Sequence, residues 1–359
     1  MKNGQKKNYY VLGVMSGTSL DGVDIAELHL NRSKNGTWTY KIGRAETIAY
    51  TPKWKRALKE AVHFSEDRLH GLDRNYTLLL AQLISTFIAK NKIENLDAVC
   101  SHGHTVLHRP EKGVTLQIGN LPQLSRGIGQ RVVCNFRVQD VALGGQGAPL
   151  VPVGDALLFA EYDHCLNLGG FANVSTEKKG RRIAYDVCPV NIVLNPLAEQ
   201  LGLPYDDRGK LARSGAVCPA LYRALWGLGH YKLPPPKSLG LEWVQANVLP
   251  VLNASKTSIE NKIRTFTDGA AAQLSHQFEK GSKVLVTGGG AHNTYLLDKV
   301  KQCKEVTLVV PGATLVAFKE ALVFGLLGVL KLRGEVNCLA SVTGAERDHS
   351  SGKIFGPGR

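Results

Sequence analysis

Two apolar runs, one near the start of the chain and one near its middle, each end in a turn of small residues. Val11–Val14 leads into Met15–Gly17, and Cys165–Leu168 leads into Gly169–Gly170. Each run suits a buried strand. Because further strands, a helix and another strand follow each turn, the pattern predicts an α/β chain of two halves, with internal duplication as a hypothesis.

The remaining elements follow from apolar periodicity and from the residues that interrupt it. Strands are predicted at 10–14, 23–30, 37–48, 131–136, 165–168, 183–187 and 283–287, with another ending near residue 101. Helices are predicted at 53–93, 191–200, 258–278 and 314–331, with a short one within 120–130. We expect a His-rich loop after residue 101 and a Gly-rich loop at 143–149.

The length and composition are those of a soluble globular protein. A chain of 359 residues can form two domains with a sizeable core. No apolar run approaches the length of a membrane helix, and the basic start lacks the h-region and cleavage site of a signal peptide. These features predict a cytoplasmic protein that does not enter a membrane.

Charge and cysteine content narrow the possible ligands. The 44 basic and 30 acidic residues give a net charge of +14, but the basic residues are dispersed. This favours anionic small ligands and leaves nucleic-acid binding as a minor alternative. The seven cysteines are widely spaced without a CxxC pair, which argues against a zinc site or a disulfide framework.

The turn after the first strand is a candidate phosphate loop. Gly17 lets backbone N–H groups approach an anion, and Thr18 and Ser19 add hydroxyl donors. Asp21 or Asp24 is a candidate for holding hydrated Mg²⁺. An ordinary strand–turn–strand hairpin is the alternative.

A second glycine-rich turn, Gly288, Gly289 and Gly290, follows the predicted strand at 283–287. Successive glycines permit close backbone approach to a ligand, and a helix N-terminus after them favours phosphate. The turn matches neither GxGxxG nor the lysine-containing Walker loop. A tight structural turn is the alternative.

Polar residues after other strands are candidates for substrate chemistry. Asp186 is a candidate general base and Asn191 a candidate for orienting substrate or water, against the alternative of ordinary turn residues. His104 lies in a segment with three histidines but no recognisable zinc pattern, so a polar substrate loop or incidental histidines remain. Arg137, with Asp140 nearby, is a candidate for holding a carboxylate or phosphate, or for a surface ion pair.

Taken together, these segments resemble the anhydro-N-acetylmuramic acid kinases. The matching pieces run in order along nearly the whole chain: 13–26, 101–110, 115–120, 133–152, 167–175, 185–191, 206–215, 235–239, 286–293 and 341–345. The resemblance implies an actin-like, ribonuclease H-like or hexokinase-like fold of two α/β domains around a central nucleotide cleft. We expect residues 1–130, with about 335–359, in the N-terminal domain and 131–334 in the C-terminal domain.

The resemblance also implies the activity, which is ATP- and Mg²⁺-dependent. The substrate would be 1,6-anhydro-N-acetylmuramic acid, whose anhydro ring is opened as O6 is phosphorylated. The product would be N-acetylmuramate 6-phosphate, within cell-wall recycling, and a homodimer is implied.

Roles transfer through the matched segments. Asp186 matches the catalytic base, and Arg137 and Asp140 match the sugar-side segment, to which we add His104 and Asn191 as substrate residues. The matched ATP segments comprise Gly17, Thr18, Ser19, Leu20, Asp21, Gly22, Val23 and Asp24, and then Gly288, Gly289 and Gly290.

The chain departs from the family pattern in ways that affect the sugar contacts. Cys188 and Val190 replace the usual glycines, and Val187 and Leu239 replace threonines. His104 replaces a glutamine, and Asn135 an acid. A kinase for another sugar and a catalytically silent nucleotide- or sugar-binding protein are therefore the alternatives.

Overall fold

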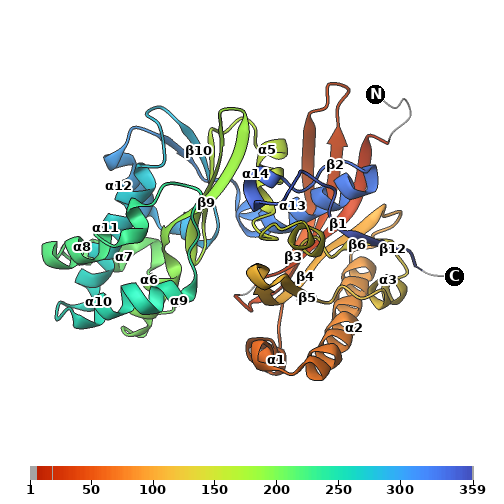
Figure 1. Ribbon diagram of the computed structural model, residues 1–359, viewed down its shortest axis with the longest axis horizontal. Helices are drawn as coiled ribbons and strands as arrows, with labels where there is room; N and C mark the ends of the chain where they lie inside the picture. The colour runs from red at the N-terminus through yellow and green to blue at the C-terminus, as the bar shows by residue number, and fades with distance from the viewer. Residues whose placement is uncertain (1–5, 18, 358–359) are drawn as a thin grey trace. The chain divides into compact units, whose positions relative to one another are not determined.

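The computed structural model describes residues 6–17 and 19–357. The chain forms two compact units (Figure 1). The first combines Met1–Leu158 with Phe318–Arg359, and the second is Phe159–Ala317. Each unit joins helices to one sheet, so the predicted α/β class with two domains is confirmed.

The first unit is built on a seven-stranded sheet with the order β12-β6-β4-β1-β2-β3, and β5 pairs with β4 outside this path. Strands β1, β2 and β3 form an antiparallel meander, whereas β4 runs parallel to β1 and β6 runs parallel to β4. The strands are β1 (Asn8–Ser16), β2 (Gly22–Arg32), β3 (Trp38–Ala49), β4 (Ala98–Arg109), β5 (Val114–Ile118), β6 (Val132–Cys134) and β12 (Lys353–Phe355).

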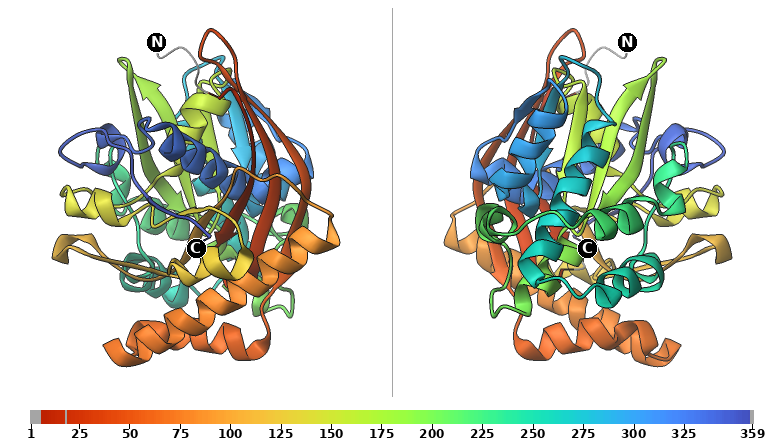
Figure 2. Two further views of the ribbon diagram at one scale, coloured as in Figure 1. Left: turned by 90° about the vertical axis from the view of Figure 1, so that its right-hand side faces the viewer. Right: turned by 90° about the vertical axis from the view of Figure 1, so that its left-hand side faces the viewer.

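Two long helices cover opposite faces of this sheet, because alternate residues of β1 point to opposite sides. Leu12 packs in the core with residues of α2 (Glu66–Lys90), the long orange helix of Figure 2. Gly13 faces α13 (Ala313–Arg333), where an added Cβ would stand 2.0 Å from the Ala321 carbonyl oxygen. Glycine is therefore required for the helix to lie this close to the strand.

The remaining helices of the first unit are short. They are α1 (Pro52–Glu60), η1 (Ala61–His63), η2 (Pro110–Lys112), α3 (Gln123–Ile128), α4 (Val138–Ala142), α5 (Val151–Leu158) and α14 (Ala340–Thr343).

The second unit is built on a five-stranded sheet with the order β11-β10-β7-β8-β9. Strands β7, β8 and β9 again form an antiparallel meander. Strand β10 runs parallel to β7, and β11 runs parallel to β10. The strands are β7 (His164–Leu168), β8 (Phe171–Lys178), β9 (Arg181–Pro189), β10 (Lys283–Thr287) and β11 (Thr307–Val309). Strand order and directions thus repeat those of β1, β2, β3, β4 and β6, as the duplication hypothesis predicts.

The helices of the second unit bury their apolar faces in one core with β7–β10. Figure 1 labels most of them at the left of the view. They are α6 (Asn191–Glu199), η3 (Asp207–Gly209), α7 (Lys210–Ser214), α8 (Pro219–Trp226), η4 (Gly229–Lys232), α9 (Leu241–Trp243), η5 (Val244–Val248), α10 (Leu249–Ala254), α11 (Ile259–Ser275), η6 (Gly289–His292) and α12 (Thr294–Cys303).

The unit boundaries differ from those predicted at 130/131 and 334/335. The first unit extends to Leu158 because β6 pairs with β4 in its sheet. It also takes in α13 from Phe318 onwards, because this helix packs on β1. At Phe318 the helix has non-helical dihedral angles, φ −113° and ψ 16°.

Helix α13 also corrects the expectation that no apolar run reaches membrane length. Among the described residues it alone is long and apolar enough to cross a membrane by length and composition. However, 61% of its most apolar stretch is buried inside the protein. Lys319 is buried within it and pairs with Asp155 at 2.8 Å. These contacts are those of a core helix.

Candidate functional site

The turn between β1 and β2 forms the first candidate phosphate segment. An added Cβ on Gly17 would meet only the Ser19 hydroxyl, at 3.7 Å, so the backbone there is open to a ligand. Leu20 has a positive φ of 61° and its N–H donates to the Gly17 carbonyl at 3.4 Å. Thr18 lies outside the described residues.

The second part of this segment is structural. Val23 is fully buried in the core. Gly22 lies against β3, where an added Cβ would stand 2.4 Å from the Ile48 carbonyl oxygen. These two residues hold the hairpin together, so only the earlier part of the segment and the acids have exposed polar groups.

Two acids flank Gly22. Asp21 is exposed, and Asp24 is half-buried with one oxygen accepting a hydrogen bond from the Thr47 hydroxyl at 2.6 Å. Burial raises the pKa of Asp24, and the charge of Asp21 adds to the rise. A divalent cation held by these oxygens would relieve that repulsion, so the pair fits the predicted magnesium role.

The predicted His-rich loop is in fact the second half of β4, because β5 pairs with it over His104–Arg109. His104 is buried, and its Nδ1 lies 2.9 Å from the Ser16 hydroxyl at the end of β1. Burial lowers the pKa of His104 to about 4. The ring is therefore neutral and links the end of β1 to the middle of β4.

His102 and Arg137 form a second pair in the first unit. The Arg137 Nε donates to His102 Nε2 at 2.9 Å, and Arg137 Nη1 donates to the Gly147 carbonyl at 2.7 Å. Burial lowers the pKa of His102 well below its usual value, and the Arg137 charge lowers it further. The neutral His102 ring thus fixes the guanidinium, which remains charged near neutral pH.

Asp140 does not have the exposure expected of a sugar ligand. It is fully buried, and its Oδ2 accepts from the Gly147 N–H at 2.6 Å. Its Oδ1 accepts from the Thr343 hydroxyl at 2.8 Å. The carboxylate is thus used within the protein and organises the loop that follows Arg137.

Glu320 is a polar residue near this site that the sequence analysis missed. It lies on α13, and the charges of Arg137 and Asp24 act on its carboxyl group in opposite directions. The signal was present in the sequence, because Lys319 and Glu320 interrupt an otherwise apolar helix.

In the second unit, Asp186 lies on β9 beside an irregularity of the β8–β9 pairing. Cys188 pairs with Ala172 and Asp186 with Asn173, so Val187 is the extra residue of a bulge. Bulges redirect neighbouring side chains and often lie near active sites.

A neighbouring segment holds Asp186. Its N–H donates to the Lys237 carbonyl and its Oδ2 accepts from the Leu239 N–H, both at 2.9 Å. Burial raises its pKa, which the Leu239 hydrogen bond partly offsets. Among the described residues, Oδ1 has no hydrogen-bond partner. Asp186 is thus a fixed carboxylate with one oxygen available to a ligand.

The glycine turn after β10 is shaped by its neighbours. Gly288 has a φ of 82°, and an added Cβ would stand 2.7 Å from Asn167 Oδ1. Gly289 has nothing within 4 Å of such an atom, so it borders open space. Asn191 lies beside this turn, 3.5 Å from the Cβ position of Gly290. Asn191 therefore lies beside the predicted nucleotide turn. Asn167 is a second polar neighbour of this turn, which was not predicted because it lies within the apolar strand at 165–168.

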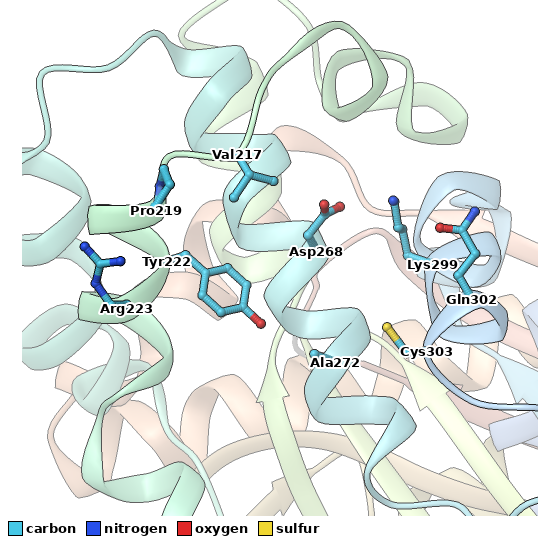
Figure 3. Close-up of a pocket in the computed structure, with 9 residues that line it drawn as sticks. All are labelled: Val217, Pro219, Tyr222, Arg223, Asp268, Ala272, Lys299, Gln302 and Cys303. Carbon is cyan, nitrogen blue, oxygen red and sulfur yellow. The ribbon is translucent and has the colours of Figure 1, made fainter.

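A separate surface pocket of about 450 Å³ lies in the second unit. Figure 3 shows Tyr222 of α8, Asp268 of α11 and Cys303 of α12 around it. The Asp268 carboxylate already accepts from Tyr295 at 2.5 Å and from Arg264 at 3.0 Å. Because this acid is used within the protein and no predicted site residue lines the pocket, we do not assign the reaction to it.

Comparisons with known proteins show the family of this chain. A family model described as anhydro-N-acetylmuramic acid kinase matches residues 9–357. Kinases of that name from Pseudomonas fluorescens and Rhodopseudomonas palustris are each 34% identical over 96% of this chain, covering 98% and 99% of those proteins. The Bacillus cereus kinase is 29% identical over 97% of this chain and 99% of its own. A xylulose kinase structure from Lactobacillus acidophilus covers 98% of this chain and 94% of its own, at 12% identity and a TM-score of 0.42, too weak a likeness to carry weight.

Proposed function

Because the chain belongs to the anhydro-N-acetylmuramic acid kinase family, we propose that it opens the 1,6-anhydro ring of anhydro-N-acetylmuramic acid and phosphorylates O6. ATP is the phosphoryl donor, and the products are N-acetylmuramate 6-phosphate and ADP, within cell-wall recycling. The observation that carries this proposal is Asp186, with one carboxylate oxygen fixed by Leu239 and the other unpaired among the described residues.

Asp186 is proposed as the general base. Its free oxygen accepts a proton from the water that attacks the anomeric carbon. The hydrogen bond from Leu239 keeps the carboxylate oriented, and its raised pKa makes it a stronger base than an exposed aspartate. As the anomeric C–O bond breaks, O6 becomes free to accept the phosphoryl group.

The glycine turns are proposed to bind the nucleotide. Gly289 leaves room for a phosphate, and Asn191 lies beside the same turn. Gly17 and Ser19 offer a backbone N–H and a hydroxyl in the first unit. We propose Asp21 and Asp24 as the groups that hold hydrated Mg²⁺. When bound, ATP supplies the γ-phosphoryl group and Mg²⁺ neutralises phosphate charge.

Arg137 is proposed to bind the carboxylate of the muramic acid. His102 and Gly147 hold two of its nitrogens, and Nη2 has no hydrogen bond to any described residue. An oriented guanidinium binds carboxylates well because its N–H groups are arranged as a planar fork. The buried His104 is proposed to support the sugar side indirectly, through Ser16.

The decisive experiment is mass analysis of the product formed from ATP, heavy-oxygen water and the anhydro sugar. We expect one phosphate and one heavy oxygen at the anomeric carbon. Asp186→Asn should lower product formation at least a hundredfold and retain ATP binding, with Asp298→Asn, an exposed aspartate of α12 in the same unit, as the matched control. Product without heavy oxygen would contradict the base role.

The alternatives give different results in the same assay. Cys188 and Val190 are buried core residues of β9 and its C-terminal turn. If they have changed the sugar preference, an ordinary hexose is phosphorylated and the anhydro sugar is inert. A silent binding protein would bind ATP without turnover of either sugar.

We also propose a cytoplasmic, homodimeric enzyme with no role in nucleic-acid or membrane binding. All seven cysteines are free thiols, as expected in a reducing compartment where ATP is available. Sedimentation would test the dimer. Retention of DNA or RNA at low ionic strength, where the charge of +14 acts most strongly, would contradict the assignment.

A further inference from the structure

Three potential metal ligands meet inside the first unit, and none of them is among the residues proposed to bind ATP. Asp140, Cys338 and His349 are buried, and their ligand atoms all lie within 4.8 Å of one another. Cys338 and His349 are opposite each other in an antiparallel bridge, joined by backbone hydrogen bonds of 3.1 Å in both directions. Opposite residues of such a bridge present their side chains to the same side.

The spacing of these atoms suits one small cation. Asp140 Oδ1 accepts a hydrogen bond from Cys338 Sγ at 3.0 Å and lies 3.6 Å from His349 Nε2. Ligands at tetrahedral angles around zinc stand roughly 3.4–3.7 Å apart, given bond lengths of about 2.0–2.3 Å. Small shifts of the side chains would therefore bring all three atoms to bonding distance.

The histidine gives the second and independent observation. His349 Nδ1 lies 3.1 Å from the Arg347 carbonyl oxygen, which accepts a hydrogen bond only if Nδ1 carries the proton. In the neutral ring, Nε2 then has a lone pair, and it has no hydrogen-bond partner although it is buried. Nε2 faces Asp140 Oδ1 at 3.6 Å, and either a proton or a metal ion between the two atoms would relieve the opposition of two acceptors.

This arrangement is the one that metal-binding histidines adopt. A ligating histidine usually donates its other ring N–H to a backbone carbonyl, which fixes the tautomer and the ring orientation. A buried carboxylate and a buried thiol complete a donor set of oxygen, sulfur and nitrogen. Thiolate and imidazole together favour zinc over magnesium or calcium.

We propose that Asp140, Cys338 and His349 bind a structural Zn²⁺ ion. On binding, the Cys338 S–H bond breaks, an S–Zn bond forms and the proton leaves to solvent. The charges of the carboxylate and the thiolate then balance the ion, so the buried site is neutral. The fourth position falls to water or to the Thr343 hydroxyl, which lies 2.8 Å from Asp140 Oδ1.

The ion would fasten the C-terminal segment to the Arg137 loop. Asp140 also binds the Gly147 N–H, and Gln146 N–H donates to the Thr343 carbonyl at 2.8 Å. Zinc at this position adds a cross-link between segments far apart in the sequence. The wide cysteine spacing concealed this site, because two of its ligands meet only through the antiparallel bridge.

Metal binding is tested on the full-length protein without ATP or sugar, so the result is independent of the proposed reaction. The protein is stripped with a chelator and titrated with Zn²⁺ against a chromogenic chelator, then with Co²⁺. We expect one tight Zn²⁺ per chain and a thiolate-to-cobalt charge-transfer band. Saturating zinc should raise the Tm by roughly 5–10 °C, for an ion at about a hundred times its Kd.

Variants assign the ligands. Cys338→Ser should remove the cobalt band and His349→Gln should weaken zinc binding at least tenfold, whereas Cys303→Ser, at an exposed cysteine of the second unit, should retain both signals. The cobalt spectrum of His349→Gln provides a second reading if Cys338→Ser folds poorly. The proposal is overturned if the wild-type protein takes up no stoichiometric zinc, or if the band survives in Cys338→Ser and disappears in Cys303→Ser.

Discussion

The two sheets share one strand order, yet corresponding strand ends are built differently. In the first unit the parallel strand β4 contains His102 and His104 on either side of Gly103. Both histidine rings are buried and hydrogen-bonded. In the second unit the corresponding strand β10 is followed by Gly288 and Gly289, and Gly289 borders open space. The same topology therefore supports a filled strand end in one unit and an open one in the other.

We expect this difference to give the two units different roles. The glycines of the second unit leave room for a ligand to approach the backbone, and Asp186 adds one free carboxylate oxygen. The first unit instead uses neutral rings to position a charged side chain, Arg137. A repeated fold thus offers two equivalent sites that can specialise separately.

The largest effect on activity is expected in the second unit, at Asp186. Asp186→Asn should lower kcat by about 10²–10⁴-fold, the usual contribution of a general base, with ATP affinity unchanged. Steady-state kinetics and ATP titration measure both quantities. Equal losses of kcat and of ATP binding would show that Asp186 supports the fold of the turn instead.

The same residue predicts two pH effects of defined sign. Because Asp186 must be ionised to act, kcat should fall as the pH drops through its pKa, which is raised above the ordinary value of about 3.9. A raised pKa also means that ionisation costs stability as the pH rises through it. Asp186→Asn should therefore be at least as stable as the wild type at neutral pH, as thermal unfolding will measure. A lower Tm at neutral pH would argue against this sign.

Substitution of Arg137 tests the site of the first unit, where the His102 ring positions the guanidinium. Arg137→Lys keeps the charge but loses the planar fork, so we expect KM for the anhydro sugar to rise about 10- to 100-fold with KM for ATP unchanged. The exposed Arg131→Lys is the matched control. If KM for ATP rises instead, the guanidinium serves the nucleotide.

A pair of glycine substitutions tests the contrast directly. Gly289→Ala should leave Tm unchanged and raise KM for ATP about tenfold, because open space surrounds it in the described structure. Gly103→Ala should lower stability by about 2–4 kcal/mol, since φ is 75° and its Cβ would stand 2.5 Å from the Ile118 oxygen. Gly229→Ala, also in open space, is the control. Loss of stability in Gly289→Ala would remove the contrast.

The smallest effect concerns pH and the first unit. His102 and His104 have lowered pKa values, so the unfolded chain binds protons between about pH 6.5 and 4 that the folded chain does not. Stability should therefore fall as the pH drops through this range. His104→Gln should flatten the dependence of Tm on pH by a few degrees, and the exposed His63→Gln should leave it unchanged.

Elements with a strong local signal could be predicted from the sequence. The apolar run of β10 ends in glycines and was predicted with its observed bounds, Lys283–Thr287. The helical pattern of 53–93 was recognised, but the chain divides it into α1, η1 and α2, and Ser65 between them is extended, with a ψ of 161°. The polar residues at the start of α2 are as typical of a helix interior as of a helix boundary, so periodicity alone did not locate the boundary between η1 and α2.

Features that depend on pairing between distant segments could not be predicted. His104 looks like a loop residue until β5 pairs beside it, and Asp140 looks exposed until residues 338–349 fold over it. For the site, the sequence located Asp186 and the glycine turn, because both follow apolar strands. It missed Asn167 and Glu320, whose surroundings are made by residues from other elements.

The helix α13 has a consequence for synthesis of the chain. The first sheet needs this helix against Gly13, and most of the helix comes after the second unit in the chain. The second unit, in contrast, lies wholly within Phe159–Ala317. During translation the second unit is therefore complete before α13 can pack on the sheet of the first unit. Until then that sheet has one apolar face uncovered, and we expect a chaperone to bind there.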